Sequence, residues 1–176
     1  MNVQKNALNG VIYLGVALVM LACAASCHNP ESRQTNKTTI NMGEAKGYRT
    51  DIEKAAVENN DFRKVLYTSK HMQLVLMTLK PNEEIGEEVH EEIDQFFRFE
   101  SGKGMCIING NIYKIKSGDV IIVPAGARHN VINNDSAMEL KMYTIYSPPN
   151  HKDGIIRATK KEAETNGVKF DGQTTE

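Results

Sequence analysis

Short apolar runs, separated by turn-forming residues, fill the middle of this chain. Runs of about four to eight residues with alternating apolar and polar positions are typical of β-strands. The pattern predicts strands at 62–68, 73–79, 95–99, 105–108, 112–115, 120–123, 129–132 and 138–145. Because these segments are short and fairly evenly spaced, they indicate an all-β fold, either a sandwich or a closed barrel.

Local signals add one hairpin and two short helices to this pattern. The Asn109-Gly110 pair between two apolar runs predicts a type I′ hairpin, in which both turn residues take positive φ. Thr50 or Asp51 is placed to cap a short helical turn, and residues 160–165 predict a second helix at the surface before a disordered end. The strands are therefore expected to be flanked by short helical segments.

An apolar stretch at residues 11–22 follows a single Lys near the start of the chain. It is short for the ~20 residues that span a bilayer and is typical of the apolar region of a signal peptide. Cys23 and Cys27 follow among small residues, and the segment resembles the lipobox of bacterial lipoproteins, whose cysteine carries the lipid. Cys23 is favoured because it directly follows the apolar run, and plain cleavage near Ala25 is the alternative. We expect export to the bacterial cell envelope, with a lipid anchor as the only membrane attachment.

The rest of the chain has the length of one domain with appendages. After a leader at 1–27, residues 28–46 contain almost no large apolar side chains and predict a polar tether. Residues 47–154 then form the predicted domain, and 155–176 a polar C-terminal tail. Lys and Arg total 21 against 22 Asp and Glu. Without a basic excess, nucleic-acid binding is not expected.

One segment carries five chemically distinctive residues at fixed spacing: Gly118, Pro124, Gly126, His129 and Asn133. This G-x5-P-x-G-x2-H-x3-N pattern resembles the second motif of the cupin superfamily in full. Pro124 and Gly126 bend the chain, and His129 opens the returning strand. The resemblance implies a cupin barrel, a double-stranded β-helix or jelly roll of two antiparallel sheets, with His129 pointing into it.

The first cupin motif is present upstream in altered form. Counting back from Gly102 gives Asn82-x5-Glu88-x-His90-x4-Gln95-x6-Gly102. Relative to the family pattern, Glu88 stands at the first His, Gln95 replaces Glu, and Asn82 replaces the opening Gly. Only His90 is kept among the three usual ligands of this motif.

Strand periodicity makes the altered motif chemically sensible. Residues two apart share a face, so Glu88 and His90 are expected to point inward with Glu92 on the same side. With Gln95 and His129 they form a nitrogen and oxygen donor set that suits one divalent ion: Fe, Mn, Zn or Ni. The alternative is a barrel that has lost its metal and satisfies its polar interior by hydrogen bonds.

The wider run over 62–154 resembles small single-domain bacterial cupins that are often labelled mannose-6-phosphate isomerase-like. One such fold hosts many activities. We expect a metal-dependent enzyme, an oxygenase or an isomerase, acting on a small oxygen-rich molecule, with Glu88 or Glu92 as the proton-transfer group. The alternative is a non-catalytic module that binds a small molecule, such as a saccharide, in the same cavity. A homodimer is left open.

Other side chains near the motifs have less specific roles. Arg98 and Arg128 are expected on outward positions or in a loop, which argues against a phosphosugar pocket. His151 follows a rigid Pro-Pro pair and is a candidate to cap the barrel mouth. The apolar residues expected to line the pocket, or alternatively to pack as core, are Phe97, Phe99 and Val131.

Overall fold

Nine strands and two short helices make up the part of the chain that the structure, a computed structural model, describes: residues 45–176. The predicted leader, both lipidation candidates and nearly all of the predicted tether lie outside the described residues. Within residues 45–176, no helix is long and apolar enough to cross a membrane.

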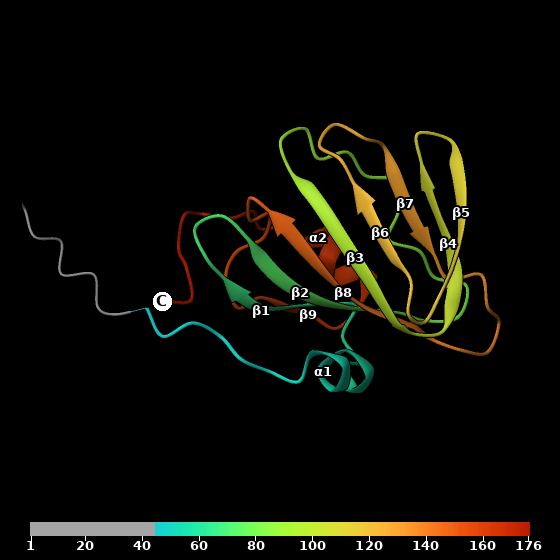
Figure 1. Cartoon of the computed structure of the whole chain (residues 1–176), viewed down its shortest axis with the longest axis horizontal. Helices are drawn as coiled ribbons and strands as arrows, with labels where there is room; N and C mark the ends of the chain where they lie inside the picture. The colour runs from blue at the N-terminus through green and yellow to red at the C-terminus, as the bar shows by residue number, and fades with distance from the viewer. Residues whose placement is uncertain (1–44) are drawn as a thin grey trace, which may run out of the picture. The chain divides into compact units, whose positions relative to one another are not determined.

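The strands form two sheets in which every neighbouring pair is antiparallel. The larger sheet has the order β6 (Val120–Val123), β3 (Asp94–Ser101), β8 (Leu140–Ser147), β2 (Gln73–Leu79), β1 (Arg63–Thr68) and β9 (Ile156–Arg157). The smaller sheet has the order β5 (Asn111–Lys116), β4 (Lys103–Ile108) and β7 (His129–Ile132). In Figure 1 the smaller sheet stands at the right, beside β3 and β6. The predicted all-β fold of two antiparallel sheets is confirmed.

All eight predicted strands are present, with small differences at their ends. The last of them begins and ends two residues later than predicted, because Met138 is 58% exposed in the preceding loop and Tyr146 is buried. The ninth strand, β9, was not predicted. It is only two residues long and is defined by its pairing with β1, so it carries no periodicity of its own.

The inward side chains are apolar over most of the interior and polar toward one end. Alternation along β8 places Leu140, Met142, Thr144 and Tyr146 inside. Tyr146 is paired with Gln73 on one neighbouring strand and with Gln95 on the other. These three buried residues therefore form a row across the larger sheet. They lie at the end of the interior that contains buried polar side chains.

Two turns contain an Asn in the left-handed region, and the first of them confirms the predicted hairpin. Asn109 and Gly110 have φ values of 48° and 82°, as the predicted type I′ hairpin requires. Asn82, which replaces the motif's opening Gly, has a φ of 61°. Asn adopts this left-handed conformation more readily than most residues, so the replacement keeps the turn.

Both helices are where the sequence places them. Helix α1 spans Ile52–Glu58, and the Asp51 side chain caps it by accepting from the Lys54 backbone N–H at 3.2 Å. Helix α2 spans Lys160–Thr165 and is capped by Thr159.

The prediction of a disordered C-terminal end is wrong, because the last residues are hydrogen-bonded to the barrel. The Phe170 N–H donates to the Asn150 carbonyl at 3.0 Å, and the Thr175 N–H donates to the Thr68 carbonyl at 2.9 Å. Together with β9 and α2, these contacts make residues 155–176 part of the folded body rather than a separate polar tail.

Candidate metal centre

Glu88, His90 and His129 converge in the interior. Each offers one ligand atom, and these atoms all lie within 4.8 Å of one another. Oε2 of Glu88 is 3.4 Å from Nε2 of His90, and the two imidazole ring centroids are 5.5 Å apart. The structure thus brings together three of the four residues that the sequence nominated as metal ligands.

The backbone holds these residues in place independently of their side chains. The N–H of Glu88 donates to the carbonyl of His129 at 2.9 Å, and the N–H of His129 donates back to Glu88 at the same distance. The Gly126 N–H also donates to the His90 carbonyl at 2.8 Å. The segment before β3 is therefore fastened to the bend that precedes β7.

The orientation of His129 leaves one ring nitrogen available as a ligand. Its Nδ1 lies 3.1 Å from the carbonyl oxygen of Ala127, which can only accept, so Nδ1 carries the proton. Nε2 is buried and has no hydrogen-bond partner among residues 45–176. Burial lowers the pKa of His129, which favours the neutral ring. Metal-bound histidines are commonly oriented by such a hydrogen bond from the other ring nitrogen.

Gln95 supplies a buried amide oxygen close to this cluster. Its side-chain Nε2 donates to Oγ1 of Thr144 at 3.1 Å, whereas Oε1 has no partner in the part of the chain that the structure describes. Gln95 is paired with Tyr146, whose ring lies edge-on to His90 at a centroid distance of 5.7 Å. The fourth predicted ligand is therefore paired with a residue that contacts His90, and its Oε1 has no hydrogen-bond partner among residues 45–176.

The unsatisfied atoms test whether these residues fit a metal ion. Nε2 of His90, Nε2 of His129 and Oε1 of Gln95 are all buried without a hydrogen-bond partner in the described range. Such buried polar atoms are rare, and each costs roughly 1–3 kcal/mol. A divalent ion would satisfy all three, and a set of nitrogen and oxygen donors without thiolate suits Fe, Mn, Zn or Ni. The donor set fits.

Arg63 is a site residue that the sequence analysis missed. It is buried on β1, with Nη2 3.9 Å from Oε1 of Glu88. Burial by itself would raise the pKa of Glu88, but the close contact with His90 and the Arg63 charge outweigh it and lower that pKa. The alternation that points Val65 inward also points Arg63 inward, so the signal was present in the sequence.

The other two arginines lie where the sequence placed them. Arg98 is outward on β3 and pairs with Glu100 at 3.5 Å, and Arg128 is exposed in the bend and pairs with Glu87. Both therefore point away from the interior as predicted, whereas Arg63, for which no prediction was made, faces it.

Glu92 does not share the face of Glu88 and His90, so that prediction is wrong. It is exposed in the turn at residues 91–92, which directly follows His90. Strand alternation ends where the chain turns, and it no longer decides which way the next side chain points. Of the two candidate proton-transfer residues, only Glu88 lies in the site.

The three apolar residues proposed as pocket walls are all fully buried. The rings of Phe97 and Phe99 stack with their planes 7° apart. The Phe97 and His129 rings meet edge to face, with their centroids 6.3 Å apart. Val131 belongs to the same core. All three therefore pack as core residues, and Phe97 also contacts the metal-ligand cluster.

His151, the predicted cap of the barrel mouth, lies beside Tyr146 and Gln73. It is buried, and its ring meets Tyr146 edge-on at a centroid distance of 5.0 Å. The Gln73 side chain holds its backbone, accepting from the N–H at 2.9 Å and donating to the carbonyl at 2.6 Å. Burial, reinforced by the charge of Arg63, lowers the pKa of His151 to about 2, so the ring is neutral near pH 7.

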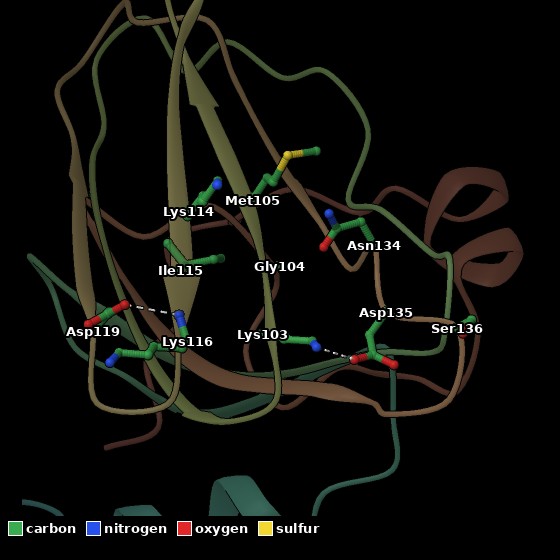
Figure 2. A pocket seen from close by; sticks show the side chains of 10 residues that line it. All are labelled: Lys103, Gly104, Met105, Lys114, Ile115, Lys116, Asp119, Asn134, Asp135 and Ser136. Atoms are coloured by element: carbon green, nitrogen blue, oxygen red, sulfur yellow. Dashed lines mark hydrogen bonds and ion pairs between the residues drawn. The ribbon is translucent and has the colours of Figure 1, made fainter.

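A separate cavity of about 620 Å³ lies on the outer surface of the smaller sheet. Figure 2 shows Lys103 reaching Asp135, at an N···O distance of 3.3 Å, along its rim. Its lining residues are Lys103, Gly104, Met105, Lys114, Ile115, Lys116, Asp119, Asn134, Asp135 and Ser136. None of them is a predicted metal ligand, so this cavity is distinct from the candidate centre.

Comparisons with known proteins agree with this architecture. The sequence profile of the cupin domain matches residues 75–146. The chain is 41% identical over 127 residues to the uncharacterized protein YrkC of Bacillus subtilis, covering 67% of this chain and 66% of that protein. It is 37% identical over 125 residues to an uncharacterized protein of Acanthamoeba polyphaga mimivirus, covering 69% and 78% of the two chains.

A solved crystal structure is also similar to this chain in fold and in sequence. The crystal structure of BH2720 from Bacillus halodurans is 33% identical in sequence, with a TM-score of 0.67. The match covers 70% of this chain and 98% of that one. The two chains therefore share one fold over nearly the whole length of the Bacillus halodurans protein.

Proposed function

This chain belongs to the cupin family, and on that premise we propose that Glu88, His90, Gln95 and His129 bind one divalent metal ion. The proposal extends to catalysis: a metal-dependent enzyme, of the oxygenase or isomerase type, acting on a small oxygen-rich molecule. The observation that carries it is the convergence of three ligand atoms within 4.8 Å, together with the burial of the Nε2 atoms of His90 and His129.

A divalent ion in this position would polarise an oxygen of the bound molecule. The chain's own residues supply the groups that accept and hold protons. Glu88 is ionised, because His90 and Arg63 lower its pKa, and it is the group in the site that is placed to accept a proton. Tyr146 keeps its proton, because burial raises the pKa of its hydroxyl. His151, which is buried and neutral near pH 7, packs against the Tyr146 ring.

One set of contacts favours the non-catalytic alternative. Glu88 already has Arg63 on one side and His90 on the other, so its charge has partners without a metal. A barrel whose buried charges are paired without a metal would be a binding module for a small molecule, such as a saccharide, at the same end of the interior.

Metal analysis of the purified protein tests the proposal. The expected result is one divalent ion per native chain, lost in His129→Ala and kept in His71→Ala, whose side chain is exposed. Stoichiometric metal in the His129 variant would refute the ligand assignment. Oxygen consumption and sugar-phosphate isomerisation are then compared between the native protein and His90→Ala. Metallated protein that turns over neither substrate, yet gains thermal stability with a saccharide, supports the binding module instead.

We also propose that the chain is exported and lipid-anchored, on the sequence of its first 27 residues alone. Growth of the source cells with a radioactive fatty acid should label the protein. Cys23→Ser is expected to abolish the label and Cys27→Ser to leave it. Native protein that stays unlabelled would overturn the anchor.

A further inference from the structure

Arg63 directs a buried positive charge at the candidate metal centre. Its side chain is 9% exposed, and Nε has no hydrogen-bond partner in the described residues. The guanidinium carries five N–H donors, yet its contact with Glu88 is a single ion pair at 3.9 Å. A buried charge of this kind is costly unless its donors are used. Arg63 therefore has donor capacity left for another acceptor.

The charge balance of the site points to the nature of that acceptor. A divalent ion and Arg63 together bring three positive charges, and the only carboxylate in the ligand cluster is Glu88. Histidines bind metals as neutral rings. The other acidic residues of the same segment, Glu87, Glu91 and Glu92, are exposed. A loaded site is thus short of negative charge.

We propose that the molecule bound at this site is a small carboxylate, held by Arg63 through its carboxylate while a neighbouring oxygen faces the metal ligands. The inference rests on the proposed metal site. Glu88 contacts Arg63 through Oε1 and His90 through Oε2, so a single carboxyl group separates the guanidinium from the imidazole. A 2-hydroxy or 2-oxo acid has its two oxygen groups on adjacent carbons and matches that short span. Arginine is also the side chain best shaped to hold a carboxylate with two parallel hydrogen bonds.

Matched pairs of carboxylates and amides test this inference in the zinc-loaded full chain. Lactate, acetate and malonate are each compared with lactamide, acetamide and malonamide by titration calorimetry. The expected result is that at least lactate binds about tenfold or more tightly than its amide. Arg63→Met should remove that preference and keep the zinc. The control is Arg98→Met, which removes an outward arginine that pairs with Glu100.

Two readouts keep the failures apart. Zinc stoichiometry reports on the proposed metal site, and the carboxylate preference reports on Arg63. A zinc-loaded protein that prefers no carboxylate to its amide, or an Arg63→Met variant that retains the preference, would overturn the inference and leave the metal site standing. If Arg63→Met does not fold, Arg63→Lys replaces it, and lactate should bind more weakly to that variant because lysine lacks the planar fork. Unchanged lactate affinity in Arg63→Lys would likewise contradict the inference.

Discussion

Glu88 and His129 face each other across a single antiparallel bridge, and each donates its backbone N–H to the other's carbonyl at 2.9 Å. Two candidate ligands from distant parts of the sequence are therefore placed by main-chain bonds rather than by their own side chains. Replacing either side chain should leave the bridge intact. Metal binding and folding can then be measured separately in single variants.

Glu88→Gln is expected to lower zinc affinity at pH 7 by at least about a hundredfold, because it removes the only charged ligand. The metal-free protein should lose roughly 1–3 kcal/mol of unfolding free energy, since Arg63 loses its partner. Competition with a chromophoric chelator measures the affinity, and urea unfolding measures the stability. Glu87→Gln, at the exposed neighbouring position, should change neither zinc affinity nor metal-free stability by a comparable amount. Equal zinc affinity in the two variants would exclude Glu88 as a ligand.

Gln95→Glu is expected to bind zinc at least about tenfold more tightly than the native chain, because a carboxylate replaces a neutral amide oxygen. Without metal the same variant should be less stable at pH 7, because Gln95 is 1% exposed and its amide donates to Thr144, a bond that the new carboxylate cannot donate. Chelator competition and urea unfolding again give the two values.

Gln73→Glu is the matched control for that variant. Gln73 is equally buried but is bonded to Thr68 and to the backbone of His151. It should lose stability without gaining zinc affinity. A gain in zinc affinity in both variants would show that added charge, and not the position of Gln95, is responsible.

The strands and three of the ligands were predictable because their signals are local. A short apolar run bounded by turn-forming residues marks each strand of four or more residues, and Asn109-Gly110 fixes a turn by its own backbone preference. The spacing from Glu88 to His90 puts both on one face, and the Pro124-to-Gly126 bend aims His129 at them.

The remaining features depend on contacts between segments that are far apart in the sequence. Arg63 belongs to the site because β1 carries it to Glu88, and no pattern around residue 63 shows that neighbour. Residues 155–176 are polar and look unable to fold, yet their backbone groups pair with β1 and with the chain near Asn150. The prediction that Glu92 points inward was wrong for the opposite reason. A local turn at residues 91–92 ends the alternation on which that prediction was based.

Gly102 is expected to tolerate a side chain far less well than Gly118. Both have positive φ, at 85° and 92°. A Cβ at Gly102 would lie 2.3 Å from the carbonyl oxygen of Glu139, whereas nothing lies within 4 Å at Gly118. Gly118→Ala should cost about 1–2 kcal/mol from backbone strain alone. Gly102→Ala should cost at least about 3 kcal/mol, measured by urea unfolding. Equal losses would show that the Glu139 backbone moves aside freely.

Buried His151 predicts a fall in stability at mildly acid pH. Its pKa is about 2 in the folded protein, because burial and the nearby Arg63 charge disfavour the protonated ring. In the unfolded chain a histidine has a pKa of about 6.5. Below about pH 6.5 the unfolded chain therefore binds a proton that the folded protein does not. The unfolding free energy must fall with pH, by about 1.4 kcal/mol per pH unit for this one group.

Urea unfolding of the metal-free protein at about pH 7, 6 and 5 measures that slope. His129 also has a pKa lowered by burial, so it contributes its own slope to every variant that retains it. The difference between the native protein and His151→Gln isolates His151. It should shrink by about 1.4 kcal/mol per unit once the pH is well below 6.5. His71→Gln, at an exposed position, should follow the native curve. If the unfolding free energies of the native protein and of His151→Gln change in parallel with pH, His151 binds its proton equally well in the folded protein, and the prediction is wrong.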